Sequence, residues 1–527
     1  DAVRETMRGL VPAYMVPARI VVIDELPLSA NGKLDRRLLP AVDASVTREY
    51  RAPSTPVEEA VADAFAAVLG VQRVGVDDNF FELGGNSLSA TRVIARINAR
   101  LGTSVGIREM FETADVAGFA ARVESATSDT RAPLVARERP DRIPLSLAQQ
   151  RMWFLNQFDT VSPAYNVPLA VRLTGPLDVD ALVRAVQDVV ARHESLRTYY
   201  PQDELGPFQK IVPAAELTLD FERDSVAEDR VRGRLVSFVA RGFDVTAGVP
   251  VRGLLLETAA DSHVLMIVMH HISADGFSVA PLARDVMIAY GSRSEGNAPV
   301  WSPLEVQYAD YTLWQRDVLG AVDDPDSVLA EQLSYWKESM AGLDGPIELP
   351  FDRPRPEVQS MSGHEIGFFV PARVMDALQE VCRGSRATLF MGVHAAFSVL
   401  LSKLGNTRDV VVGTPIAGRA DEALDHLVGM FVNTLALRLD VDPDLSFVDL
   451  VRSASAVDLG AFANADVPFE NVVEAVDPER STAFNPLFQV GFSFQNLAPV
   501  QATLSGLQVA ALEPGSEISQ YDLHLVV

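Results

Sequence analysis

A stretch near the middle of the chain constrains the fold most. Residues Val264–Met269 form an unbroken apolar run of strand length, which predicts a buried strand. Two histidines, His270 and His271, follow it directly, and Asp275 and Gly276 lie in the polar turn beyond them. Because neighbouring residues of a strand point to opposite faces, we expect one histidine to face a cavity and the other to pack into the structure.

The spacing alone leaves two interpretations open: a core histidine beside a solvated turn, or a general base held rigidly at the edge of a core. Asp275 is close enough in sequence to pin the turn electrostatically, and Gly276 is expected to permit a backbone shape that other residues resist. The residue types favour the second interpretation. The pattern His270-His271-x-x-x-Asp275-Gly276 resembles the HHxxxDG signature of condensation domains in nonribosomal peptide synthetases, which resemble the chloramphenicol acetyltransferase family.

The charge of the chain argues against several classes of partner. The 527 residues include 45 Lys and Arg against 71 Asp and Glu, a formal net charge of −26, which repels nucleic acids and anionic membranes. No apolar stretch approaches the ~20 residues of a membrane span. The single cysteine, Cys382, excludes internal disulfides and metal sites built on several cysteines. We therefore expect no metal site and a cytoplasmic location.

The chain looks like an internal piece of a longer polypeptide. It begins at Asp1 without a methionine or a signal peptide, and it closes on a strand-like run, Tyr521–Val527. Near the start, Asn31-Gly32 is a hairpin signal that places Lys33 just past a tight turn. An exposed hairpin lysine is the simplest interpretation of Lys33.

A second resemblance gives Lys33 a role. Residues 10–17 and 31–36 resemble the last two core motifs of synthetase adenylation domains. This implies that residues 1–45 are the C-terminal part of such a domain, a small α+β remnant. It also implies that Lys33 is the lysine that contacts the substrate carboxylate and the nucleotide phosphate. Because the nucleotide-binding part is absent, Lys33 is expected to be catalytically stranded here.

Residues 52–126 are predicted to form a compact bundle of four short helices. Apolar residues recur at helical spacing over Val57–Leu69, with Thr55 as N-cap, Pro56 at the first helical position and Gly70 as the stop. Further helices are predicted up to about Leu101, near residues 107–111 and over residues 116–123. The glycines before the second helix are expected to allow a close approach of the chain.

Ser87 lies at the mouth of the second predicted helix. A serine there is first of all a candidate N-cap, although a helix N-terminus also favours a phosphodiester. The run Asp78–Leu88 resembles the attachment motif of peptidyl carrier proteins nearly residue for residue. This implies that 4'-phosphopantetheine is attached covalently to Ser87 by a phosphopantetheinyl transferase that uses CoA.

A polar, Pro-containing segment without periodicity, residues 127–141, is predicted to be an interdomain linker. Residues 142–527 then alternate between strands and helices, and they resemble a condensation domain through seven motifs in order. These motifs lie at residues 146–155, 192–198, 270–276, 308–314, 428–438, 466–470 and 480–487. The resemblance implies two acyltransferase-like α/β lobes that meet at a channel around His271. The domain is expected to end before its final strands and helix.

The resemblance also implies a reaction. Ser87 would carry a donor thioester, and a downstream carrier would bring the acceptor amine, while the adenylation domain lies upstream in the same polypeptide. We expect His271 to orient the amine and accept its proton, Asp275 to support the turn and His270 to pack. Asn433 and Ser278 are weaker candidates for lining the channel.

A rival function is a carrier and docking module whose condensation-like domain is inactive. The intact histidine motif argues against it. A freestanding acyltransferase that uses a diffusible CoA ester is disfavoured by the covalently linked carrier. The amino acids joined, and the stereochemistry of the donor, cannot be read from the sequence.

Overall fold

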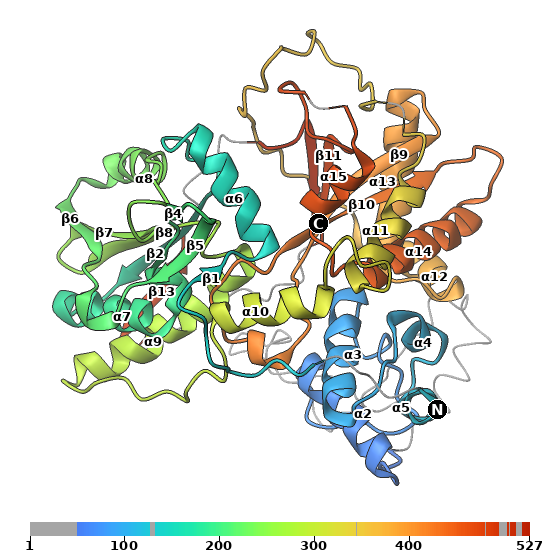
Figure 1. Cartoon of the computed structure of the whole chain (residues 1–527), viewed down its shortest axis with the longest axis horizontal. Coiled ribbons are helices and arrows are strands. Elements are labelled where there is room, and N and C mark those ends of the chain that lie inside the picture. Colours follow the sequence, from blue (N-terminus) through green and yellow to red (C-terminus); the bar gives the residue numbers. More distant parts are fainter. Residues whose placement is uncertain are drawn as a thin grey trace, which may run out of the picture.

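The computed structural model describes residues 50–126, 132–343, 345–479, 481–494, 503–504, 506–512 and 519–527. The predicted adenylation remnant, residues 1–45 with Lys33, lies outside the described residues. A helical bundle is followed by two lobes, each built around a sheet (Figure 1). The bundle lies beneath the second lobe, on the side where the two lobes meet (Figure 1).

The bundle consists of α2 (Pro56–Leu69), α3 (Ser87–Leu101), α4 (Ile107–Glu112) and α5 (Val116–Ser125). The predicted start and stop of the first helix are confirmed: Thr55 caps α2 by accepting a hydrogen bond from the Glu58 amide at 3.1 Å, and Gly70 ends it at φ +67°. The bundle packs around fully buried aromatic rings, with Phe65 and Phe80 edge to face at 4.9 Å. The prediction of a small four-helix core is therefore correct.

The segment before α3 brings the chain close to the bundle core. Gly84 has a φ of +102°, and a Cβ on Gly85 would lie 2.2 Å from the Phe80 ring. Both positions therefore favour glycine, as expected. The N-cap of α3 is Asn86, whose Oδ1 accepts from the Ser89 amide at 2.9 Å. Ser87 is the first residue of the helix rather than its cap, so the capping interpretation of Ser87 is wrong.

The first lobe is built on a six-stranded sheet in the order β12-β13-β2-β8-β7-β6. Its elements are β1 (Ile143–Pro144), α6 (Leu147–Phe158), β2 (Asn166–Thr174), α7 (Val179–Arg192), β3 (Thr198–Tyr199), β4 (Gln202–Asp203), β5 (Gly206–Ile211), β6 (Asp220–Ser225), α8 (Val231–Val239), β7 (Val251–Ala259), β8 (Ser262–His270) and α9 (Val279–Ser294). β1, β3, β4 and β5 form a separate small sheet.

The run Val264–Met269 of strand β8 is apolar without a break because both faces of the strand are covered. Leu265, Ile267 and Met269 pack in one cluster with residues of α7 and α9. The alternate residues Val264, Met266 and Val268 pack in another cluster with residues of α8. This explains why an unbroken apolar run, rather than an alternating one, forms the strand. The predicted buried strand is confirmed.

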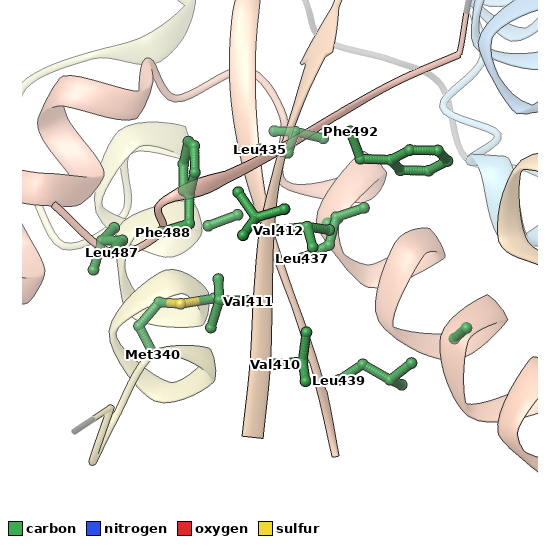
Figure 2. Packing of buried hydrophobic residues seen from close by; sticks show 14 of the residues in the cluster. Met340, Val410, Val411, Val412, Leu435, Leu437, Leu439, Leu487, Phe488 and Phe492 are labelled. Carbon is green, nitrogen blue, oxygen red and sulfur yellow. The ribbon is translucent and has the colours of Figure 1, made fainter. Parts of the chain in front are cut away.

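The second lobe contains a four-stranded sheet in the order β10-β9-β11-β14. Its elements are α11 (Val328–Ser339), α12 (Ala372–Gly384), α13 (Leu389–Gly405), β9 (Asp409–Ile416), β10 (Asn433–Asp440), α14 (Phe447–Ala463), α15 (Phe469–Val476), β11 (Val490–Ser493) and β14 (Leu523–Val526). In Figure 2, Val411 of β9 lies toward Met340, whereas Val410 and its cross-strand partner Leu439 lie on the other side. The sheet thus contributes residues to the core on both of its faces.

Within the described residues, two strands and a helix join the lobes. Strands β12 (Thr503–Leu504) and β13 (Leu507–Ala511) lie in the sheet of the first lobe, where Val509 of β13 is the antiparallel partner of Leu173 in β2. Helix α10 (Tyr308–Leu319) runs across the junction of the lobes (Figure 1). The C-terminal region therefore completes a sheet that began near the start of the condensation domain.

The described part of the predicted linker, residues 132–141, is fixed to the condensation domain. The Trp314 indole of α10 donates to the Ala132 carbonyl at 2.6 Å, and Arg137 pairs with Asp317 at 2.7 Å. Arg139 pairs with the buried Asp310 at 2.7 Å. This part of the linker follows α10 instead of forming a free tether.

Candidate active site and carrier site

His271 stands at the end of β8 and lines a cavity of about 280 Å³ between the lobes. Its amide donates to the Tyr165 carbonyl at 2.8 Å, which fixes the main chain as it leaves the strand. The cavity is lined by Ala148, Arg151, Met152, Tyr165, His271, Gln359, Met361, Met430, Val432, Asn433, Thr434, Phe469, Glu470, Asn485, Phe488, Gln520 and Tyr521. Residues of both lobes thus surround the imidazole.

One ring nitrogen of His271 faces the protein and the other faces the cavity. Nδ1 is buried, whereas Nε2 makes no hydrogen bond within the described residues. Burial lowers the pKa of His271, and the nearby Asp275 charge opposes this shift. The imidazole is therefore neutral near pH 7, and Nε2 can accept a proton or a hydrogen bond from a group in the cavity.

His270 packs into the first lobe. Its side chain is 2% exposed, and its ring lies 6.3 Å from the Tyr165 ring and 6.2 Å from the Phe243 ring. Nδ1 accepts from the Ile272 amide at 3.1 Å. Burial, followed by the neighbouring His271, lowers the pKa of His270 to about 3. This histidine is a neutral packing residue that also holds the turn.

Asp275 joins the turn after β8 to the second lobe. One carboxylate oxygen accepts from the amide and the hydroxyl of Ser278, both at 2.8 Å. The other accepts from the amides of Phe431 and Val432 at 2.9 and 3.1 Å. Arg419 adds an ion pair at 3.3 Å. A fully buried carboxylate is tolerated here because every partner is a donor.

Ser278 and Gly276 differ from what the sequence predicted. Ser278 is fully buried and absent from the lining of the His271 cavity, so the expectation that it lines the channel is wrong. Its hydroxyl donates to Asp275 and accepts from the Gly429 amide at 3.1 Å. Gly276 is exposed, its φ is not positive, and a Cβ there would meet open space. A special backbone shape is therefore not the reason for glycine at this position.

We expect Asp275→Ala to destabilise the condensation domain strongly. The change leaves four hydrogen-bond donors without their acceptor: the amide and hydroxyl of Ser278 and the amides of Phe431 and Val432. It also leaves the Arg419 guanidinium buried without its carboxylate partner. We therefore predict a loss of about 3–5 kcal/mol in the free energy of unfolding. Urea denaturation followed by tryptophan fluorescence measures this loss. Glu331→Ala, on the exposed side of α11, is the matched control and should shift the transition little. Equal shifts in the two variants would contradict the bridging role of Asp275.

Asn433 lines the His271 cavity at the start of β10, but its amide group is fully used by the main chain. Nδ2 donates to the carbonyls of Ala465 and Val467 at 2.9 and 2.7 Å, and Oδ1 accepts from the Phe469 amide at 3.0 Å. The side chain therefore shapes the cavity wall by holding the loop before α15.

A second cavity, of about 140 Å³, lies between the condensation domain and the carrier bundle. Thr91 and Arg92 of α3 line it on the carrier side, and Tyr311 and Trp314 of α10 line it on the other. It shares Ala148, Met430, Val432 and Asn433 with the cavity of His271. The two cavities therefore adjoin across these four residues, with the carrier helix on one side and the imidazole on the other.

A third cavity, of about 780 Å³, adjoins the His271 cavity on a different side and shares Arg151, Phe469 and Glu470 with it. Arg151 of α6 pairs with Glu470 of α15 there. Neither residue is assigned a role by the sequence, because they lie in different motifs and only the fold brings them together. Arg419 was also assigned no role from the sequence, because only the fold brings it to Asp275.

Several histidines that stand alone in the sequence have partners in the structure. His394 pairs with Asp458 at 2.9 Å, and both are fully buried. His193 contacts Asp285 at 3.0 Å, His426 contacts Arg284 at 2.9 Å, and His524 contacts Ser493 at 2.8 Å. None of these histidines lines the His271 cavity. They are accounted for by local packing.

The residues around Ser87 fit a phosphopantetheine group. Ser87 opens a helix of 15 residues, and Asn86 already takes the capping role. The first turns of such a helix present main-chain amides that favour a phosphate. Thr91 and Arg92, one turn further along α3, line the cavity that faces the condensation domain. Lys33 cannot be compared with this site because it lies outside the described residues.

The described residues contain neither a cluster of metal ligands nor a single helix suited to crossing a membrane. Within those ranges, no cluster of three or more His, Cys, Asp and Glu side chains is arranged to hold a metal ion. No single described helix is long and apolar enough to cross a membrane; α12 and α13 pass such a test only as a pair bent by 109°.

The fold and the site together consist of a helical bundle followed by a two-lobed α/β domain with a histidine at the junction of its lobes. The chain belongs to the condensation domain family, which it matches over residues 140–527. Residues 59–123 match the phosphopantetheine attachment site family. The chain therefore contains a carrier domain that bears 4'-phosphopantetheine on a serine, followed by a condensation domain.

Named relatives place both domains in nonribosomal peptide synthetases. The chain is 44% identical over 524 residues to a dimodular nonribosomal peptide synthase of Bacillus subtilis (strain 168), covering 99% of this chain and 22% of the relative. It is 37% identical over 531 residues to malpibaldin synthetase of Mortierella alpina, covering 98% of this chain and 9% of that relative. The chain thus spans about a fifth or less of these relatives.

Solved structures share the fold. The X-domain from teicoplanin biosynthesis superposes with a TM-score of 0.69 at 32% identity, covering 75% of this chain and 87% of that one. The first condensation domain of the CDA synthetase superposes with a TM-score of 0.59 at 20% identity, covering 74% and 90%. The predicted two-lobed acyltransferase-like fold is confirmed.

Proposed function

We propose that this part of a synthetase forms an amide bond between an acyl group carried on Ser87 and the amine of an amino acid on a downstream carrier. The observation that carries the proposal is the adjoining pair of cavities. One begins at α3 of the carrier, the other contains His271, and they share four lining residues. The proposed reaction requires the pantetheine arm to reach His271, and two cavities that adjoin between α3 and His271 support such a route.

The prosthetic group supplies a flexible arm that ends in a thiol, which holds the acyl group as a thioester. Ser87 is the proposed attachment residue, and Thr91 and Arg92 lie where the arm would leave the carrier. Across the cavity, the aromatic rings of Tyr311 and Trp314 offer an apolar surface to the arm. Holding the two reactants in line contributes much of the rate enhancement in reactions of this type.

His271 is proposed to orient the amine and to accept its proton. An α-amine has a pKa of about 7.7–8.0 in water, so its deprotonation at pH 7 costs only about 1 kcal/mol. The larger need comes once the nitrogen has bonded to the acyl carbon, because it then carries a proton that must leave. Nε2 of a neutral imidazole that lines the cavity is suited to take it.

Asp275 and Asn433 are proposed to act as positioning residues. Asp275 holds the turn after His271 against the loop at Phe431 and Val432. Asn433 holds the opposite wall of the cavity. Neither side chain has a free group that points to the reacting atoms.

Further partners follow from the arrangement of the domains. A phosphopantetheinyl transferase with CoA would load Ser87, and an upstream adenylation domain, whose end would contain Lys33, would supply the acyl group. A separate carrier would present the acceptor amine through the cavity beside Arg151 and Glu470. A cytoplasmic location is proposed, since the loading reaction draws on CoA.

A single-turnover assay on the full chain tests the proposal. The chain is loaded with a preformed aminoacyl pantetheine group, mixed with an aminoacyl pantetheine as acceptor, and quenched at intervals. Mass spectrometry should show the dipeptide on the acceptor, while the unloaded chain should yield none. If the loaded chain keeps its acyl group and forms no dipeptide, the domain is instead an inactive docking module.

The pH dependence of this reaction should reflect the lowered pKa of His271. Below about pH 7.7 the rate falls because the acceptor amine is protonated. After correction for the fraction of free amine, we expect a flat profile through about pH 6.5, the ordinary imidazole value. The corrected rate should decline only at lower pH. Burial disfavours the charged imidazole and lowers the pKa of His271, Asp275 opposes this shift, and Arg151 adds to it. A corrected rate that halves at about pH 6.5 would contradict this.

A further inference from the structure

The carrier helix α3 is positively charged in an otherwise acidic chain. Residues 87–101 contain Arg92, Arg96 and Arg100 and no acidic residue, whereas the whole chain has a net charge of −26. Residues four apart lie on the same helix face, so Arg92 and Arg96 form a pair of cations on one side of α3. That side faces the condensation domain.

The two arginines converge on one carboxylate of the condensation domain. Asp425 lies just after a single 3-10 turn, Glu422–Leu424. Its Oδ2 accepts from Nη2 of Arg92 at 2.7 Å and from Nη2 of Arg96 at 2.9 Å. Glu422 lies 3.7 Å from Arg96. An arrangement in which two guanidinium groups share one oxygen depends on both the charge and the spacing of the arginines.

The contact is more sheltered than an ordinary surface ion pair. The Arg96 and Asp425 side chains are 15% and 12% exposed, whereas Arg100 and Asp63, which pair within the carrier, are 54% and 67% exposed. Salt screens a sheltered pair less effectively. The Arg96–Asp425 pair therefore contributes more to association than an exposed pair does.

The condensation domain concentrates negative charge at this place. Asp421 lies on the same loop, and burial together with Glu305, Glu422 and Asp425 raises the pKa of its carboxyl group. Clustered carboxylates of this kind repel one another and attract a cationic helix. An acidic or neutral helix in the position of α3 would leave their repulsion unrelieved.

We propose that Asp425, supported by Glu422, is the site by which the condensation domain recognises its donor carrier. The recognised feature is a pair of arginines one turn apart, Arg92 and Arg96, on the helix that Ser87 opens, and the partner is this chain's own carrier. The inference rests on the proposed function in treating that carrier as the donor. A carrier without this pair would dock poorly.

The ion pairs also set the register of docking. Apolar contact comes from Phe111 of α4, which packs against the core of the second lobe, and from Leu459 and Phe462 of α14, which pack against the carrier core. Such contacts have little directionality. Arg92 both pairs with Asp425 and lines the cavity toward His271. The charges thus align the start of α3 with the cavity.

Hydrogen–deuterium exchange on the full chain tests the proposal without turnover. The readout is the exchange rate of α14 around Leu459 and Phe462, which the carrier covers and which lies outside the substituted loop. Glu422→Arg with Asp425→Arg should raise that rate roughly tenfold or more, because like charges then face each other. Arg92→Asp with Arg96→Asp should do the same.

Combining all four substitutions reverses both partners and should restore the protection of α14. Arg100→Asp, on the same helix but paired with Asp63, is the matched control and should leave α14 protected. Asp425→Asn removes the charge but keeps the shape of the side chain, so that a change in this variant cannot be ascribed to misfolding. It should give an intermediate exchange rate of α14. Unchanged protection in the Asp425 variants, or no recovery in the combined variant, would overturn the proposal. If a loaded chain forms no dipeptide although α14 keeps its normal protection from exchange, that result would count against the proposed function and not against the docking proposal.

Discussion

We expect the Ser87→Ala chain to gain no mass when it is incubated with a phosphopantetheinyl transferase and CoA. The hydroxyl of Ser87 is the proposed nucleophile toward CoA, and alanine removes the only atom that could form the phosphodiester. The wild-type chain should shift completely by the mass of one phosphopantetheine group in intact-mass measurements. Because no group can then be charged, amide formation by the variant should fall to the uncatalysed background.

The control for this experiment is Ser125→Ala. Ser125 is an exposed serine at the end of α5 in the same bundle, so its loss leaves the helix start at Ser87 untouched. This variant should be modified like the wild type. A mass shift in the Ser87→Ala chain, or its loss in the Ser125→Ala chain, would place the arm on another residue and would remove the link between the carrier-facing cavity and the attachment site.

The second large effect is expected from His271→Ala. Removing a positioned general base typically costs about 10²–10⁴-fold in rate, and the remaining activity would come from holding the reactants together. The measurement is the single-turnover rate of amide formation from a fully loaded donor. Loading of Ser87 must be equal in the two chains, so that the difference reports on the condensation step.

An exposed histidine provides the matched control for His271. His364 lies outside the cavities that reach the carrier and His271, so His364→Ala should retain the wild-type rate. Chemical unfolding of the His271→Ala chain should show little change, since Nδ1 has no hydrogen-bond partner to lose. A normal rate in the His271→Ala chain would remove the imidazole from the mechanism and would favour a docking role for the domain.

Local sequence signals predicted the parts of the fold that depend on local physics. Thr55, Pro56 and Gly70 marked the ends of α2 because caps and stops act within one turn. The apolar run before His270 marked β8 because a strand covered on both faces needs no alternation. The glycines before α3 were also correctly assigned, since both the positive φ of Gly84 and the Phe80 contact of Gly85 exclude larger residues.

Three features that were missed or misassigned depend on distant contacts. Ser278 was placed on the channel wall, although its hydroxyl is used by Asp275 and by Gly429 of the other lobe. The Arg92–Asp425 pair joins residues of two domains, and no spacing in the sequence announces it. The packing of residues 132–141 was also not predicted, because only the fold shows that α10 holds them. All three features depend on contacts between residues that are far apart in the sequence, rather than on local propensity.

The place of β13 in the first sheet has a consequence for how the polypeptide is made. Because Val509 is the partner of Leu173, a nascent chain that has emerged from the ribosome as far as α9 leaves one edge of β2 open. That edge stays open until the region around residue 509 has been synthesised. Pairings between such distant segments form slowly, and unpaired strand edges invite association with other chains. Chaperones that shield an open strand edge are thus expected to engage the nascent chain between the synthesis of α9 and that of the region around residue 509.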